Sequence, residues 1–235
     1  MNKQQMIGNM SACAGMMKDF WRQVGDGSIT KQMFVDFLQH KNPFAITDIR
    51  QEWQEFYRKY FRMDVDFSDI QIHEDYADFV RRILIPKGLT LNQVIKAIHK
   101  HFNISFGGYD INKIGNHGIN ESAVCNIRST KLNYDIYIRG LVEADEKFKD
   151  ISANQLKERG VNCITLLERL IYELKYWDET GQHLDLHTLT ICAGSSLDGF
   201  VPNVGWCLAK DWLDVDSYDL DDSCDSARVR EVVRS

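Results

Sequence analysis

Apolar residues in the first part of the chain recur at the three- and four-residue spacing of amphipathic helices. One helix is predicted after Ser28, which can cap its N-terminus, and Pro43 marks its end. A second helix is predicted after Thr47, with an apolar and aromatic stripe of Ile49, Trp53, Phe56 and Tyr60. Large aromatic side chains are mostly buried, so this stripe favours a packed core over a cofactor site. We therefore predict a helical N-terminal segment over residues 1–75.

The remainder of the chain begins with a short apolar run followed at once by a helical pattern. The segment Phe79–Ile85 predicts a strand, because it is apolar and ends in a Pro-Lys-Gly turn. Thr90 and Gln93 have the spacing of a capping box at the start of the helix that follows. Another strand is predicted from Tyr134. A strand followed by a helix and a second strand indicates a mixed α and β domain.

Two helices with clear ends come next. Ser152 can cap the shorter helix and Thr165 the longer one, and a Gln or Glu three residues later completes each capping box. Gly181 ends the longer helix, whose wide apolar stripe predicts packing on a sheet. A strand over Leu189–Cys192 then begins a series of short strands. We predict an α+β fold with an antiparallel sheet for residues 76–235.

The last strands alternate apolar and polar residues. Val204 and Trp206 share one face of the first of these strands, while Leu213 and Val215 share one face of the next. Polar or small residues lie between them. A period of two residues is typical of half-buried strands, so we expect these four side chains to be buried and their neighbours to be exposed.

Residue usage in the same region is unusual. Residues 211–225 contain seven Asp and no basic side chain, and residues 198–225 contain no Glu, Gln or Met. Every residue in the longer stretch can be encoded by a codon that ends in a pyrimidine, except Trp206, Lys210 and Trp212. All the others can therefore arise from an AAC codon whose adenines are replaced.

This usage, together with the segments ICAGS, DGFVPNVGW and ARVREVV, resembles the variable region of target proteins of diversity-generating retroelements. Adenine-directed mutagenesis rewrites such regions, here about residues 195–226. The resemblance implies a C-type-lectin-type fold, with antiparallel sheets and two flanking helices, whose first and last strands lie side by side. In this chain Phe79–Ile85 would pair with Ala227–Val233.

The resemblance also implies a ligand-binding or recognition protein rather than an enzyme. Buried residues would be kept while outward-facing residues change, so that recognition varies at little cost in stability. The expected ligand-binding residues are Phe200, Asn203, Gly205, Cys207, Asp214, Asp216, Tyr218, Asp221 and Asp222. The expected partner is an unknown protein or a cell-surface ligand, and the N-terminal helices are a candidate surface for homo-oligomer formation.

Charge and hydropathy limit the classes of partner and the cellular locations that we expect. The formal net charge is −6, and nucleic-acid binding needs clustered Lys and Arg, so we expect no nucleic-acid partner. No apolar run is long enough to span a bilayer, and the N-terminus lacks the order of a signal peptide. We expect no membrane insertion and a cytoplasmic or virion-associated protein. The six cysteines show no C-x-x-C pair, which favours free thiols.

Patterns for catalysis or metal binding are weak, and we expect no cofactor and no metal. His183 and His187 have a zinc-like spacing, but no Glu lies between them and the preceding helix has ended, so turn or surface histidines are favoured. The aspartates after residue 213 lack the glycine and the closing Glu of a calcium loop. Calcium-dependent lectins carry a Glu-Pro-Asn type motif, whereas this chain has Val201 before Pro202.

Two alternatives stay open at this level. One is an enzyme related to the formylglycine-generating branch of the fold, with Cys207 and Cys224 as reactive thiols, although we expect the nearby carboxylates to raise their pKa. The other is a viral structural or tail protein with a fixed acidic face. Acidic stretches are often only solvated surface, but the alternating apolar residues favour a structured, displayed face.

Overall fold

The computed structural model describes residues 17–25, 27, 29–30, 33, 48–72, 76–107, 121–197 and 199–234. The chain divides into a smaller unit, Met1–Asp48, and a larger unit, Ile49–Ser235. In the smaller unit, residues 17–25 form a helix. The helix predicted between Ser28 and Pro43 lies almost entirely outside the described residues.

Helix α3 (Ile49–Phe61) belongs to the larger unit, although we expected the domain boundary near residue 75. The cap predicted for it, Thr47, lies outside the described residues. Its aromatic stripe joins the main core, as the sequence predicted. Tyr57 adds a specific tie, because its buried hydroxyl donates a 2.7 Å hydrogen bond to the carbonyl oxygen of Leu84. The helix is thus an integral part of the larger unit.

The three capping boxes predicted from the sequence are confirmed. In each, the hydroxyl of Thr90, Ser152 or Thr165 accepts a hydrogen bond from the third helical N–H, and the Gln or Glu side chain there bonds back to the cap. Gly181 ends the longest helix in a left-handed conformation, with φ 68°. The boxes begin α4 (Leu91–Ile98), α5 (Ala153–Glu158) and α6 (Leu166–Thr180).

The strands form two sheets. The smaller contains β1 (Arg81–Ile85) and β4 (Tyr134–Ile138), in antiparallel register. The larger has seven strands. Its path runs through β2 (Ile104–Phe106), β8 (Trp212–Asp219), β7 (Phe200–Cys207), β5 (Leu189–Ile191) and β9 (Ala227–Arg228), and β6 (Ser195–Leu197) joins β7 to β3 (Val124–Asn126). Short 3-10 helices lie at η1 (Glu121–Ala123) and η2 (Glu146–Phe148).

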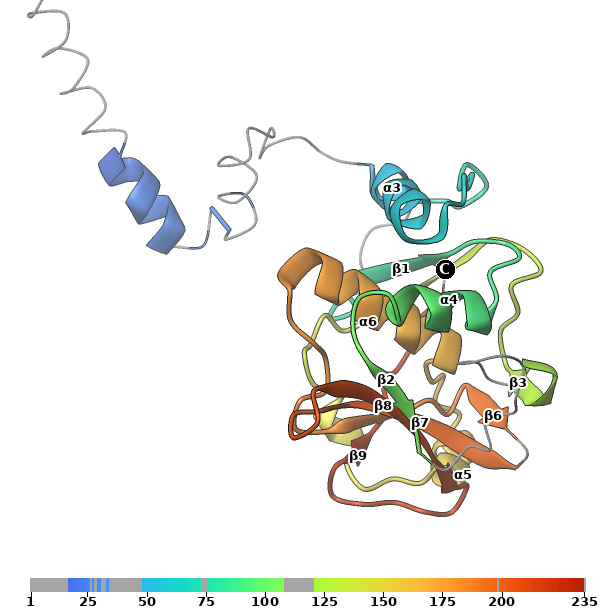
Figure 1. Ribbon diagram of the computed structural model, residues 1–235. Helices are drawn as coiled ribbons and strands as arrows, with labels where there is room; N and C mark the ends of the chain where they lie inside the picture. The colour runs from blue at the N-terminus through green and yellow to red at the C-terminus, as the bar shows by residue number, and fades with distance from the viewer. Residues whose placement is uncertain are drawn as a thin grey trace, which may run out of the picture. The chain divides into compact units, whose positions relative to one another are not determined.

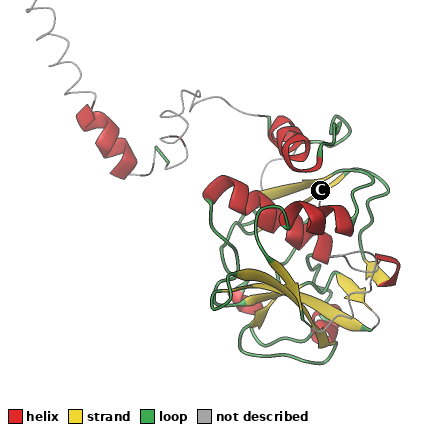
Figure 2. Cartoon of the chain, in the orientation of Figure 1, coloured by secondary structure: helices red, strands yellow, loops and turns green. Residues whose placement is uncertain are grey.

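Most pairings are antiparallel, but β2 runs parallel to β8 and β9 runs parallel to β5. The larger unit is therefore a mixed α+β structure, as predicted. Figures 1 and 2 show α4 and α6 between β1 and the larger sheet, and α5 on the opposite side of that sheet. The main core lies between the two sheets, where Leu170 of α6 and Val204 of β7 are both fully buried. A second core covers part of the other face of the larger sheet and includes Leu156 and Val201.

The predicted pairing of the first and last strands is wrong. β1 pairs with β4, and only Ala227–Arg228 of the terminal segment forms a strand, which lies beside β5. Further on, Val233 forms a bridge with Tyr137 of β4, so β4 separates β1 from the C-terminal segment. The physical reason is burial: every residue of β4 is buried, which suits an interior position with neighbours on both sides.

Candidate functional site: the β7–β8 hairpin

The inner face of the hairpin β7–β8 is apolar. Val204 lies opposite Val215, and Trp206 lies opposite Leu213. Trp206 is 7% exposed, and the other three side chains are fully buried in the main core against the helices. The burial predicted for these four residues is confirmed, because the strand alternation places all of them on the face that α6 covers.

The outer face carries polar side chains at the alternate positions. Cys207 lies at the turn end of this face, where it pairs with Trp212. The half-buried outer residues of β8 are Asp214, Asp216 and Tyr218, while Asp221 and Asp222 are exposed in the turn after the strand. Six of the nine expected ligand-binding residues are therefore at least partly accessible on this face or beside it.

Neighbouring groups contact and constrain the side chains of the two aspartates of β8. Burial raises the pKa of Asp214; a hydrogen bond with Ser105 of β2 opposes this shift, and the nearby Asp216 carboxylate adds to it. Asp216 accepts a 2.8 Å hydrogen bond from the backbone N–H of Ser217. A Cβ atom at Gly107 would lie 2.8 Å from an oxygen of Asp216, so a side chain at residue 107 would require this carboxylate to move. Neither aspartate is a freely moving surface charge.

Three of the nine expected residues are not accessible on the outer face. Asn203 is 4% exposed, because β7 is an interior strand and Asn203 lies between Ile191 of β5 and Asp216 of β8. Gly205 has little room for a side chain, since an added Cβ would lie 3.1 Å from the carbonyl oxygen of Thr188 and the neighbouring backbone would have to shift. Phe200 is 43% exposed, but alternation places it on the same face as Val204 and Trp206.

The two cysteines of this region do not form a reactive pair. Cys207 pairs with Trp212 at one end of β8, whereas the thiol of Cys224 lies 3.6 Å from the hydroxyl of Tyr218 near the other end. Six residues of strand separate these positions, which is roughly 20 Å. Burial raises the pKa of Cys224, but hydrogen bonds from Ser226 and Tyr218 outweigh it and leave the pKa lowered. The carboxylate effect that we expected does not dominate there.

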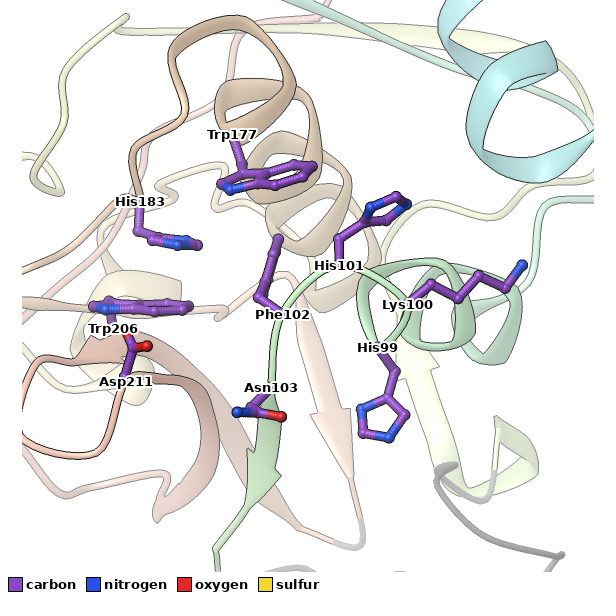
Figure 3. Close-up of a pocket in the computed structure, with 9 residues that line it drawn as sticks. All are labelled: His99, Lys100, His101, Phe102, Asn103, Trp177, His183, Trp206 and Asp211. Carbon is purple, nitrogen blue, oxygen red and sulfur yellow. The ribbon is translucent and has the colours of Figure 1, made fainter.

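A pocket of about 400 Å³ lies beside the inner face of the hairpin, between α6 and the end of α4 (Figure 3). Its aromatic wall is built from Phe102, Trp177, Trp206 and the imidazole of His183. The His183 ring stacks on Trp206 with 3.3 Å between centroids and 8° between planes, and Phe102 meets both rings edge-on. His183 is thus part of an aromatic cluster although its backbone lies in the loop after α6, and His187 is an exposed loop residue, as the sequence favoured.

A network of buried charges holds His183 in place from behind. Its Nδ1 lies 2.9 Å from a carboxylate oxygen of the fully buried Glu173. Arg169 donates to Glu173 and also to Asp185, and Arg230 from the C-terminal segment donates to the other oxygen of Asp185 at 2.6 Å. Two cations balance two carboxylates here, so each buried charge has an opposite partner. Arg169 and Glu173 are one turn apart on α6, but Asp185 and Arg230 come from separate segments, so no local pattern predicts the network.

We also searched the described residues for metal-binding clusters and membrane-spanning helices. These residues contain no group of three or more His, Cys, Asp or Glu side chains placed to hold a metal ion. No helix among them is long and apolar enough to cross a membrane. The chain matches no protein-family model, no curated protein and no solved structure.

Proposed function

We propose that the protein is a recognition module whose hairpin β7–β8 presents a ligand-binding face on a C-type-lectin-type scaffold. A diversity-generating retroelement would rewrite this face by adenine-directed mutagenesis. The ligand would be a protein or a cell-surface group, and the host would be a virus or a cell. Binding, rather than catalysis, would be the activity of the face.

The observation that carries this proposal is the separation of roles within one hairpin. The inner residues Val204, Leu213 and Val215 are fully buried, whereas Asp214 and Asp216 alternate with them on the accessible side. Substitutions on an accessible strand face change stability by about 0.5 kcal/mol or less, whereas core substitutions cost several times more. The hairpin can therefore vary its outer side chains while its inner side chains keep the fold.

The proposed face is smaller than the sequence alone indicated. It contains Cys207, Asp214, Asp216, Tyr218, Asp221 and Asp222. Two expected members, Asn203 and Gly205, are assigned to the scaffold because one is buried and the other packs closely against the backbone of Thr188. Phe200 is exposed on the opposite face, so it would contact a partner only if the partner wraps around the strand edge.

The acidic character of the face indicates the charge of its partner. Asp221 and Asp222 are exposed in the turn after β8, and Asp214 and Asp216 are half-buried on the outer side of the strand. Opposite charges across an interface accelerate association and are screened by salt. We therefore expect this version of the face to bind a basic surface, and to bind it more weakly as ionic strength rises.

A paired set of variants tests the proposal. The triple variant Asp214→Ser, Asp216→Asn and Tyr218→His uses only residues that an edited AAC codon can encode, and it should keep its melting temperature within a few degrees. The same variant should lose binding to a partner isolated by surface display against the wild-type protein. Asn203→Asp, from the same codon set, serves as the buried control and should destabilise the fold, because it places a charge inside.

Two outcomes would contradict the proposal. A collapse of the triple variant's thermal melt would show that the outer residues hold the fold. Binding that stays unchanged would place the interaction surface elsewhere on the chain. At the level of genes, a near-copy of the segment encoding residues 195–226, differing at adenines and located beside a reverse-transcriptase gene, would distinguish a diversified face from a fixed acidic face.

The enzyme alternative has less support. A formylglycine-type oxidation that uses two thiols needs them close together, and Cys207 and Cys224 lie near opposite ends of β8. Among the remaining described cysteines, burial raises the pKa of Cys163 to about 12 and also raises the pKa of Cys192. Thiols of this kind are poor nucleophiles at neutral pH.

A further inference from the structure

The pocket in Figure 3 lies on the opposite side of the sheet from the proposed recognition face and has a chemistry of its own. Most of its lining comes from outside the variable stretch, and only Trp206 and Asp211 come from the hairpin. The pocket is about 400 Å³ in volume, which is large enough for a single aromatic ring and its substituents. Its ligand would therefore not change when the variable face changes.

One nitrogen of His183 is fixed and the other faces the pocket. A carboxylate can only accept a hydrogen bond, so Nδ1 must carry the proton that bonds to Glu173. A ring whose single proton is on Nδ1 presents Nε2 as an acceptor. Nε2 has no hydrogen-bond partner among the described residues, and it is not among their fully buried, unsatisfied atoms. It is therefore accessible from the pocket that His183 lines.

The walls around this acceptor combine aromatic rings with polar groups, because the lining also includes His99, Lys100, His101, Asn103 and Asp211. Trp177 and Phe102 meet at 5.5 Å between centroids, and Phe102 also contacts the stacked rings of His183 and Trp206. Aromatic groups prefer edge-to-face or offset contact with further aromatic rings. The His183 ring is held between Glu173 and the Trp206 face, so the direction of its acceptor is set before a ligand binds.

We propose that this pocket binds a neutral planar ring that carries an O–H or N–H donor, such as a phenol or an indole. The ring packs against Trp177 and Phe102, and its donor bonds to Nε2 of His183. Such a ring can belong to a free small molecule or to a Tyr or Trp side chain on another protein. The two sources share the same recognition chemistry and differ in how the ring is delivered.

Two probes that differ only in the donor test the proposal on the wild-type protein. 4-Methylphenol carries the donor, and 4-methylanisole keeps the ring but replaces the hydroxyl hydrogen with a methyl group. In an NMR titration we expect 4-methylphenol to bind about tenfold more tightly, which corresponds to one hydrogen bond to an otherwise unpaired acceptor. Equal affinity for the two probes would overturn the proposal.

Two variants locate the site. His183→Asn keeps an N–H near the position of Nδ1 for Glu173 but removes Nε2, so the preference for 4-methylphenol should fall to about onefold. Trp177→Leu removes part of the wall and should weaken both probes alike. A preference that survives in a folded His183→Asn protein, checked by its thermal melt, would show that the donor binds elsewhere. The comparison of probes on wild-type protein stands even if this variant does not fold.

A peptide arm separates the two sources. The peptide Gly-Gly-Tyr-Gly-Gly is compared with the same peptide containing Phe, and both are titrated against the wild type. A side-chain source predicts that the Tyr peptide binds at least as tightly as 4-methylphenol and about tenfold more tightly than the Phe peptide. A free-molecule source predicts that 4-methylphenol binds and the Tyr peptide does not. If neither binds, the proposal is overturned.

Discussion

Replacing Trp206 with Ala is the most direct test of the register on which the proposed recognition face depends. Trp206 is 7% exposed and contacts His183 and Phe102. Burying a Trp side chain removes about 150–250 Å² from water. At about 25 cal/mol per Å² this is worth about 4–6 kcal/mol. Ala keeps the Cβ, and the neighbouring pocket admits water, so we expect a loss of about 3–5 kcal/mol in the free energy of unfolding.

The matched control is six residues away on the same hairpin. Trp212 lies on the outer side of β8 and is half-buried. Trp212→Ala removes the same number of atoms from the other face of the hairpin, and we expect it to cost about 1 kcal/mol. The contrast between the two variants therefore reports the face on which each ring lies, not the general cost of losing a tryptophan.

Urea unfolding followed by circular dichroism measures both losses, and thermal melts provide a second reading. For a unit of this size, each kcal/mol shifts the melting temperature by about 2–4 °C, so Trp206→Ala should lower it by about 6–20 °C. A loss below about 1 kcal/mol for Trp206→Ala, or an equal loss for both variants, would refute the assigned alternation. It would also remove the physical basis of the proposed face, because a register slip of one residue exchanges the two sides.

Three further variants test other parts of the structure. Arg169→Met leaves Glu173 and Asp185 without a shared buried cation and should cost about 3–5 kcal/mol in chemical unfolding; the surface control Arg58→Met should cost less than about 1 kcal/mol. Gly205→Ala should destabilise by about 1–3 kcal/mol, and an unchanged melt would show that the neighbouring strand moves aside freely. Burial raises the pKa of Asp214 in the folded state, so the folded protein favours the protonated carboxyl group. The stability that this protonated group contributes at low pH is therefore lost as the pH rises through the folded-state pKa. The substitution Asp214→Asn should therefore raise the melting temperature at pH 7 more than at pH 3. Equal changes at the two pH values would contradict the raised pKa of Asp214.

Local patterns predicted the elements of the larger unit well. The capping residues Thr90, Ser152 and Thr165 begin helices where the sequence placed them, and Gly181 ends the longest. Caps depend on residues three or four positions apart, so the sequence contains the whole interaction. The inner face of the hairpin was equally readable, because strand alternation is a property of neighbouring residues.

Tertiary structure decided which strands are neighbours and which outer residues are accessible. Alternation assigned Asn203 to the outer face, but it cannot show that β7 is an interior strand with a second core over that part of the sheet. Likewise, the pattern gave two Arg-containing strands, and only the fold placed the fully buried β4 between them. Position within a sheet depends on contacts between distant segments, which no local periodicity encodes.

By itself, the sequence determined where most helices and strands lie, which side of the hairpin is apolar, and which stretch is rich in Asp and free of Glu, Gln and Met. Only the fold determined the pocket. Phe102, Trp177, His183 and Trp206 come from four separate parts of the chain, and Glu173 reaches His183 from within a helix. Their chemistry arises from proximity in space, because packing brings Phe102, His183 and Trp206 from separate segments to the face of α6 that carries Glu173 and Trp177.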